Sequence, residues 1–431
     1  MYLKSVELRN IRSISHYKIE FEQDKYPGWH VLLGDNGSGK SSVVRSIALC
    51  LAGPHEAPAL RQNWADWLRS GAQHGSICLD IDHEPEIDRR TGPGRSVEDF
   101  YVAPELLFNR TEAGVSLGLP KKFQHDPFRY IWGEGKGWFS ASFGPFRRFV
   151  GGSKDYEKLF YSHPRLAPHL SAFGEDVALT EAVAWLQQLH VKQLEKRPEG
   201  ELVDDMKRFI NEGELLPHGT QLTKVDSTGV YFRDGLGAEV QVEQLSDGYR
   251  AVLSMTFELV RQLCHKYDDK QVVRQIRKGN MVIDLPGVVL IDEVDVHLHP
   301  SWQRRIGQWF LRLFPKIQFF VTTHSPLICQ AANSGSIWRL PVPGDPNAFS
   351  GRVKGKELSR LLYGDVTEAY DTELFGLSGT RSDTGRERMT RLAELNRKAR
   401  GTGLSANEKS EQAALRRELP LVATVEGDGA E

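Results

Sequence analysis

Residues 34–41 of the chain, GDNGSGKS, match the pattern GxxxxGK[ST] at every fixed position. Glycines let such a loop curl so that successive backbone N–H groups face phosphate oxygens, and the dipole of a following helix adds to the attraction. Lys40 is then expected to reach the β- and γ-phosphates of ATP, and the hydroxyl of Ser41 to bind Mg²⁺. The predicted nucleotide-binding residues of this loop are Gly34, Asn36, Gly37, Gly39, Lys40, Ser41 and Ser42.

A pair of acidic residues follows a second apolar run, in VVLIDEVD at residues 288–295. Asp292 is expected at the end of a buried strand, where its carboxylate can hold Mg²⁺ directly or through water. Glu293 can polarise the water that attacks the γ-phosphate, so it is the predicted catalytic base. A buried strand that simply ends in solvated acids is the alternative, and the phosphate-binding loop upstream makes it less favoured.

Two further stretches place polar residues at predicted element ends. LSDGYR, residues 245–250, opens a helical stretch, so Ser246 and the N–H groups after it are expected to form a second anion site. THSP, residues 323–326, ends an apolar run, and the imidazole of His324 could contact a γ-phosphate or the attacking water. Each stretch alone is weak evidence, because Ser-Asp-Gly is an ordinary helix start and a lone histidine is usually structural.

Taken in order, the phosphate-binding loop, LSDGYR, IDEVD, DVHLHP and TTHSP closely resemble the motifs of ABC-type ATPases. Within that family, the soluble branch of RecF, SMC-like heads and OLD-type ATPases is the most similar, over residues 1 to about 340. The resemblance implies that Ser246 and Gly248 face the γ-phosphate bound by a second subunit. It also implies that Asp295 lies in the loop joining the two sites, and that His324 is the switch histidine with a catalytic role.

Two features match that family less closely. Arg12, within RNIRSI, stands where the branch often has a basic residue near the nucleotide, and a plain surface arginine is an equal alternative. The family's Q-loop glutamine, which contacts Mg²⁺ and water, has no clear match. WFSASFGPFRRF, residues 138–149, occupies the expected region, where Ser140 or Ser142 could take its place.

The elements around the phosphate-binding loop are predicted as strands, loop and helix. LKSVELRNIRSI and YKIEF alternate as half-buried strands, and WHVLL is a short buried strand before the loop. The helix after the loop carries its apolar residues on one side and ends at Gly53-Pro54. Those residues are Val43, Val44, Ile47, Ala48 and Leu51.

Residues 281–328 return to a strand, helix, strand pattern. Two nearly continuous apolar strands flank SWQRRIGQWFLRLFP, predicted to be a helix that buries one face and ends at Pro315. Such a pattern predicts a parallel sheet covered on both faces. Together with the resemblance, it predicts an α/β fold, an ABC-type P-loop ATPase head. The apolar face of the helix comprises Trp302, Ile306, Trp309, Phe310 and Leu313.

The other segments of the head are a β-rich stretch and a helical stretch. Residues 54–138 are interpreted as an irregular β-rich arm inserted in the head. Residues 155–215 are predicted to form a helical subdomain, followed by a hairpin with turn chemistry at Asp234-Gly235. The head is predicted to span residues 1–345.

The C-terminal extension, residues 346–431, is expected to be mainly helical. It begins with a loop-like stretch, residues 361–383, and continues in two amphipathic helices, with capping-box spacing of Ser405 and Glu408 at the second. A folded-back cap and a surface that docks a partner are equal alternatives for this extension.

Composition excludes several classes of protein. The 431 residues carry a formal net charge of −2 and 40% apolar side chains, so the average charge does not indicate nucleic acid or a membrane surface. The four cysteines have no metal-binding spacing and are expected to be free buried thiols. The chain has neither a signal peptide pattern nor an apolar run long enough for a membrane span, so a cytoplasmic location is expected.

The resemblance predicts a homodimer, or a higher even oligomer, with two composite sites that bind ATP and Mg²⁺. ATP binding would hold the subunits together and hydrolysis would release them. Residues 54–244 have no sustained heptad repeat, which argues against a long-armed SMC protein. A transporter ATPase is also disfavoured.

The compact head, SFGPFRR, DEVDVHLHP and the short helical extension look most like ATPases of prokaryotic anti-phage systems, such as the PtuA proteins of Septu and those of retron modules. We therefore expect an ATP-dependent sensor or scaffold that controls a partner effector, a nuclease or toxin encoded nearby, without a membrane partner.

Two alternatives remain at this point. One is a RecF-like repair ATPase that holds DNA through Arg147, Arg148 and Lys154, although a solvated face is the more favoured interpretation of that basic cluster. The other is a scaffold whose nucleotide is structural and scarcely hydrolysed, against which Glu293 argues.

Overall fold

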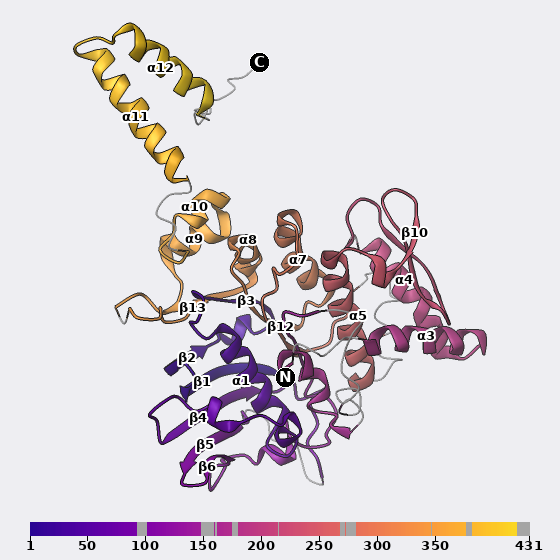
Figure 1. Ribbon diagram of the computed structural model, residues 1–431. Helices are drawn as coiled ribbons and strands as arrows, with labels where there is room; N and C mark the ends of the chain where they lie inside the picture. The colour runs from indigo at the N-terminus through magenta and orange to yellow at the C-terminus, as the bar shows by residue number, and fades with distance from the viewer. Residues whose placement is uncertain are drawn as a thin grey trace. The chain divides into compact units, whose positions relative to one another are not determined.

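The computed structural model describes residues 1–92, 101–147, 159, 162–174, 180–213, 215–267, 272, 282–345, 347–375 and 382–419. The chain divides into two compact units, Met1–Ala369 and Tyr370–Glu431. The first unit contains two large sheets and the helices packed on them, and Figure 1 traces its elements.

The central sheet has six strands within the described residues, in the order β14-β13-β3-β12-β11-β7. From β13 to β7 the neighbours are parallel, and β14 pairs antiparallel with β13 at the edge. Because parallel strands end on the same edge, the chain leaves β3, β12, β11 and β7 side by side. The bounds are Gly28–Leu33 (β3), Ser140–Phe143 (β7), Gly287–Ile291 (β11), Ile317–Thr322 (β12), Gly335–Arg339 (β13) and Gly351–Arg352 (β14).

The second sheet is antiparallel, in the order β2-β1-β4-β5-β6. It joins the predicted N-terminal strands to strands of the β-rich stretch, which therefore completes a sheet with β1 and β2. In β4 buried and less buried residues alternate, so one face of the strand can pack into the core. The bounds are Tyr2–Ile11 (β1), Ile14–Glu20 (β2), His74–Asp82 (β4), Glu105–Thr111 (β5) and Gly114–Gly118 (β6).

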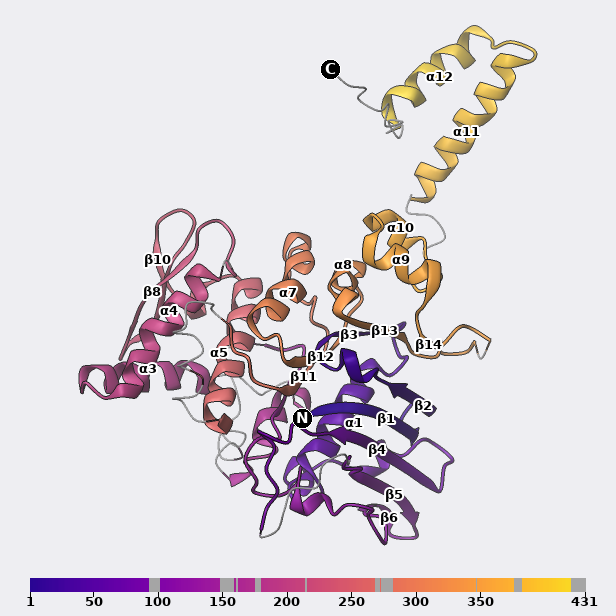
Figure 2. The same cartoon turned by 180° about the vertical axis from the view of Figure 1, so that it is seen from behind.

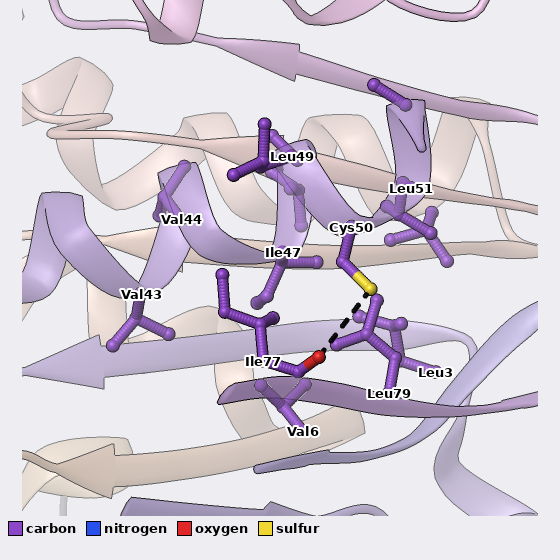
Figure 3. Close-up of a cluster of buried hydrophobic side chains, with 14 of the residues drawn as sticks. Leu3, Val6, Val43, Val44, Ile47, Leu49, Cys50, Leu51, Ile77 and Leu79 are labelled. Carbon is purple, nitrogen blue, oxygen red and sulfur yellow. Dashed lines mark hydrogen bonds between the residues drawn. The ribbon is translucent and has the colours of Figure 1, made fainter. Parts of the chain in front are cut away.

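Helix α1, Lys40–Ala52, lies between the two sheets and contacts β1 and β4 as well as β11 and β12. Every residue from Ser46 to Ala52 is buried, so the helix is enclosed on more than the single side that we predicted from its sequence. Figure 3 shows its side chains packed against Leu3, Val6, Ile77 and Leu79 of the second sheet. The second sheet buries the other side of the helix. The spacing of apolar residues within the helix cannot predict that contact.

Helix α7, Pro300–Leu313, covers the other face of the central strands, and the predicted parallel α/β arrangement is confirmed. In both views it lies above these strands and α1 lies below them (Figure 1, Figure 2). The helix ends before Pro315, as predicted. Its apolar face is buried as expected, at Trp302, Ile306, Trp309, Phe310 and Leu313.

A helical region with a small three-stranded sheet, β10-β9-β8, precedes the long helix α5. The predicted hairpin is present, with Asp234 N–H donating to the carbonyl of Ala238 across the turn. Helix α3 contacts both this sheet and α5. The bounds are Thr180–Leu194 (α3), Leu202–Glu212 (α4), Gln221–Asp226 (β8), Gly229–Arg233 (β9), Glu239–Gln241 (β10) and Asp247–Tyr267 (α5).

The prediction of a loop from residue 361 was wrong for its first part. Helix α8, Pro326–Cys329, is followed by α9, Gly355–Tyr363, and α10, Val366–Tyr370. Asp365 and Glu368 cap α10 reciprocally, with Glu368 N–H donating to Asp365 Oδ1 at 2.8 Å and Asp365 N–H to Glu368 Oε2 at 3.1 Å. This is capping-box spacing, a signal in the sequence that we overlooked.

The second unit contains helices α11, Asp383–Arg400, and α12, Ala406–Glu418. The predicted capping box of Ser405 and Glu408 is confirmed. The two helices share a small apolar core of Leu392, Leu395, Leu415 and Leu419.

The four cysteines are free, as predicted, and Cys50, Cys264 and Cys329 are buried. Cys78, on β4, is only partly buried, so the predicted burial was wrong for this residue. In the described part of the chain no helix has the length and apolar character that crossing a membrane requires.

Candidate nucleotide-binding site

The phosphate-binding loop connects β3 to α1 in the predicted order of strand, loop and helix. Gly37 and Gly39 have φ of 81° and 101°, a left-handed conformation that glycine adopts without steric cost. A Cβ on Gly34 would lie 2.4 Å from Ser38 Oγ, so this glycine lets the loop close on itself. Ser38 Oγ is buried and without a hydrogen-bond partner, which leaves a polar group for a ligand in the loop.

Lys40 lies along the loop that precedes it. Its Nζ donates to the carbonyls of Gly34, at 2.7 Å, and Asp35, at 3.2 Å. Burial lowers the pKa of Lys40, and the negative charges of Glu293 and Asp292 oppose that shift. The structure thus brings the lysine of the loop and the two acids of β11 within electrostatic range of each other.

Asp292 and Glu293 leave the end of β11 beside the end of β12. The hydroxyl of Thr322, at the end of β12, donates to Asp292 Oδ1 at 2.6 Å and accepts from Glu293 N–H at 2.7 Å. Asp292 is 1% exposed, and Glu293 has a φ of 48°, which is uncommon for a residue with a side chain. One hydroxyl therefore fixes both acids.

Asp295 links the loop after the acids to the segment with His324. Its Oδ1 accepts from Thr323 Oγ1 at 2.6 Å and from His324 N–H at 3.4 Å. Gln303 of α7 makes a second link, since it donates to the carbonyl of Leu298 and accepts from the hydroxyl of Ser325. His324 is exposed, whereas its N–H is bonded to Asp295 and the next residue, Ser325, is bonded to Gln303.

LSDGYR lies at the start of α5, as predicted, with Ser246 exposed. A Cβ on Gly248 would lie 2.8 Å from the carbonyl oxygen of His297, so the glycine allows α5 to approach this loop closely. Ser246 and Gly248 line a groove of about 730 Å³ together with Tyr249, Trp302 and several histidines. The phosphate-binding loop, Asp292 and Glu293 contribute nothing to its lining among the described residues.

Comparisons with known proteins identify similar families and relatives. A family described as "AAA domain, putative AbiEii toxin, Type IV TA system" matches residues 156–330, and an AAA domain family matches residues 5–96. The chain is 36% identical to the retron Vc95 probable ATPase of Vibrio cholerae over 391 residues, which cover 77% of this chain and 73% of that protein. The chain belongs to the same family of AAA-domain ATPases as this retron protein.

A second relative is the Septu protein PtuA of Bacillus mycoides, 25% identical over 381 residues, or 86% of this chain. The match spans only 45% of that longer protein. Among solved structures, an SMC head bound to the C-winged helix domain of ScpA aligns over 79% of this chain and 94% of its own, with a TM-score of 0.48 and 16% identity.

The oxygen ligands in this ATPase suit Mg²⁺, the predicted cofactor. Ser41 is the second residue of α1. The hydroxyl of Thr322 donates to Oδ1 of Asp292, while no described residue hydrogen-bonds the Oδ2 of Asp292. A hydroxyl and a carboxylate oxygen are the ligands that Mg²⁺ takes beside a phosphate. These two residues would hold the ion.

Arg12 lies close to the loop but is turned toward an aromatic ring. Its guanidinium stacks over Trp67 at 4.7 Å, and burial lowers its pKa. The neighbouring Ser13 places its Oγ 2.9 Å from where a Cβ of Gly39 would be. Arg12 Nε is buried and has no hydrogen-bond partner among the described residues. No contact tests a role of Arg12 near the nucleotide, and that role stays a prediction.

The residues proposed in place of the Q-loop glutamine are already used elsewhere. Ser140 and Ser142 on β7 both hydrogen-bond the ring of His169, Ser140 at Nε2 over 3.1 Å and Ser142 at Nδ1 over 3.0 Å. Burial lowers the pKa of His169 to about 3, so its ring is neutral. These serines therefore fix the neighbouring 3₁₀ turn, Ala167–Ala172.

For Arg147, the structure contradicts both interpretations of the basic cluster, as a solvated face and as a DNA contact. It is 4% exposed and donates to the carbonyls of Asp292 and Glu293. Arg148 and Lys154 lie outside the described residues. Sequence reasoning therefore missed the roles of Arg147 and Thr322. A hydroxyl at the end of an otherwise apolar strand was the available signal for Thr322.

Proposed function

We propose that the chain binds ATP and Mg²⁺ and hydrolyses the ATP as a head-to-tail homodimer, or a higher even oligomer, with composite sites. The separation of the two half-sites supports this proposal most. Lys40 and the acids lie together, whereas Ser246 is exposed on a groove to which they contribute nothing. A second copy could supply its Ser246 and Gly248 to the γ-phosphate held by the first.

In the proposed mechanism, N–H groups of the loop and Lys40 bind the phosphates, and Lys40 exchanges its carbonyl partners for phosphate oxygens. Ser41 and Asp292 would hold Mg²⁺, which would supply positive charge beside the phosphates. Glu293 orients and polarises the attacking water, and His324 contacts the water or the γ-phosphate. Asp295 accepts hydrogen bonds from the hydroxyl of Thr323 and the N–H of His324, so a shift of Asp295 would move the backbone of the proposed catalytic histidine.

The proposed biological role is the control of an effector, a nuclease or toxin, in prokaryotic anti-phage defence. The retron and Septu relatives support this role through their names and their similarity to most of this chain. An ATP-dependent dimer has two shapes, and a partner that binds one of them better can be switched by the nucleotide. A cytoplasmic location fits this proposal.

The dimer is tested by light scattering of Glu293→Gln, which is expected to bind ATP without hydrolysing it. We expect a monomer alone and a dimer with ATP and Mg²⁺. The double variant Glu293→Gln, Ser246→Arg should bind ATP and stay monomeric, because a large charged side chain would occupy the interface. A Glu293→Gln protein that is monomeric with ATP would overturn the composite site.

The role is tested by capturing the tagged chain from its own cells, in wild-type and Glu293→Gln forms. Recovery of one nuclease or toxin that depends on the bound nucleotide supports effector control. Recovery of DNA alone, with affinity falling steeply as salt rises, would instead favour the RecF-like alternative.

A further inference from the structure

Arg147 reaches the end of β11 from the chain segment that follows β7. β7 and β11 are parallel neighbours, with Phe143 opposite Ile291, and Asp292 N–H donates to the carbonyl of Phe143 at 2.8 Å. At Gly144 a Cβ would lie 2.1 Å from the carbonyl oxygen of Ser171, so the chain packs closely there. It then bends at Pro145, whose carbonyl accepts from Arg147 N–H at 3.2 Å, and the side chain of Arg147 returns to the strand end.

The guanidinium of Arg147 binds the backbone of both acids. Its Nη1 donates to the carbonyl of Asp292 at 3.0 Å and its Nη2 to the carbonyl of Glu293 at 2.8 Å. Nη1 also lies 3.3 Å from the carbonyl oxygen of Gly144. Two consecutive carbonyls that have left the sheet are thus fixed by one planar group, a geometry that suits arginine better than lysine.

Glu293 needs this support because its backbone is strained. A residue with a side chain at a φ of 48° costs roughly 1–2 kcal/mol relative to ordinary conformations. Arg147 holds the carbonyl of Glu293 and the hydroxyl of Thr322 holds its N–H, so both ends of the residue are fixed. Without one of them the backbone is free to relax, and its relaxation would turn the carboxylate away from its present direction.

The charge of Arg147 is buried beside the acids. Burial lowers the pKa of Arg147 to about 10, and the carboxylates of Asp292, Asp295 and Glu293 oppose that shift. A charge with 4% exposure is costly unless nearby groups compensate for it, and here the three carboxylates and the carbonyls do so. Among the described residues, the guanidinium of Arg147 therefore hydrogen-bonds only the backbone of the two acids and the carbonyl of Gly144.

We propose that Arg147 is a positioning residue for hydrolysis, which fixes the backbone of Asp292 and Glu293 so that the carboxylate of Glu293 faces the attacking water. This inference rests on the proposed role of Glu293 as catalytic base. Arg147 also joins the region after β7 to the acids, in the stretch where the family's Q-loop glutamine has no clear match. Arg147 touches neither nucleotide nor water in this role.

The test compares Arg147→Lys and Arg147→Gln with the wild-type chain in three measurements: kcat, ATP affinity by titration, and thermal unfolding without nucleotide. We expect the kcat of Arg147→Gln to fall about 100-fold, the effect of a misplacement of about 1 Å in a catalytic group. ATP affinity should change less than about 3-fold, because Lys40 and the loop are untouched. Arg147→Lys should regain part of the lost kcat.

Arg165→Gln is the control, because Arg165 also donates to two backbone carbonyls, those of Ala52 and Trp132, and pairs with Glu56 at a place without catalytic acids. It should lower the unfolding temperature and leave kcat per folded molecule unchanged. Equal behaviour of the Arg147 and Arg165 variants would overturn the inference. So would a wild-type kcat in Arg147→Lys or Arg147→Gln, and so would insolubility of both, which would assign Arg147 to stability alone.

Glu293→Gln separates this inference from the proposed function. If Glu293→Gln hydrolyses ATP at the wild-type rate, Glu293 is not the base and the proposed function fails. If Glu293→Gln is inactive and both Arg147 variants retain wild-type kcat, only the positioning role of Arg147 fails.

Discussion

The hydroxyl of Thr323 donates a hydrogen bond of 2.6 Å to the carboxylate of Asp295, and this bond joins the segment of His324 to the loop after the acids. The same hydroxyl accepts from the N–H of Ser325 at 2.9 Å. Thr323 therefore ties Asp295 to the start of α8. A displacement of Asp295 would move the backbone of His324 with it.

Thr323→Val removes this bond and keeps the shape of the side chain. We expect kcat to fall about 10- to 100-fold, the equivalent of a lost hydrogen bond to a charged group, with ATP affinity nearly unchanged. Thr256→Val is the control, because its buried hydroxyl bonds only the carbonyl of Val252 within α5. A Thr323→Val protein with wild-type kcat would show that the bond does not align His324.

Lys40→Met removes the cation of the phosphate-binding loop and keeps most of the side-chain stem. ATP affinity should fall about 10- to 100-fold, since charge-assisted hydrogen bonds to phosphate are lost. Unfolding should change little, because Lys40 bonds only the carbonyls of its own loop. Titration with a fluorescent ATP analogue measures the effect. The exposed Lys18→Met on β2 is the control, and equal affinities of the two variants would refute the assigned loop.

Stability at acidic pH should depend on two buried histidines. Burial lowers the pKa of His169 to about 3 and that of His30 to about 4, whereas an unfolded histidine titrates near 6.5. Between these values the unfolded chain binds protons that the native chain does not, so the free energy of unfolding falls as pH falls below about 6.5. The expected slope is about 1.4 kcal/mol per pH unit for each histidine.

Denaturant unfolding from pH 6.5 to pH 4.5 measures this slope. His169→Gln can still hydrogen-bond Ser140 or Ser142 and should show a smaller slope than the wild type. A slope that His169→Gln leaves unchanged would mean that this ring is protonated in the folded chain.

Removal of the second unit should leave the nucleotide site intact. A chain of residues 1–369 keeps β14 and the buried Leu361 of α9, so we expect it to be soluble and to bind ATP with wild-type affinity. A chain of residues 1–350 loses β14 and the buried side chains of Val353 and Leu361. Because burial of each such side chain stabilises the fold by about 1.5–3 kcal/mol, we expect this chain to have a lower free energy of unfolding.

The two truncations also distinguish the roles considered for the extension. If α11 and α12 dock an effector, the chain of residues 1–369 should hydrolyse ATP but no longer recover the effector from cells. Insolubility of that chain would contradict the division at residue 369 and favour a structural cap.

The sequence by itself determined the features that depend on neighbouring residues. The spacing of glycines, Lys40 and Ser41 specifies the phosphate-binding loop, because a curled loop before a helix is a local conformation. The capping box of Ser405 and Glu408 and the apolar face of α7 are local in the same sense. The apolar run before Asp292 was enough to predict a buried strand that ends in acids.

Tertiary structure decided which distant segments meet. Arg147 looked like a surface residue in a basic cluster, and only the pairing of β7 with β11 turns it onto the acids. Gln318, inside the apolar strand β12, has no local partner, and its amide bonds both backbone groups of Leu3, 315 residues away, at 2.6 and 3.0 Å. Such contacts arise from the packing of the two sheets, and no periodicity within one segment specifies them, because a buried polar group takes whichever partner the fold brings to it.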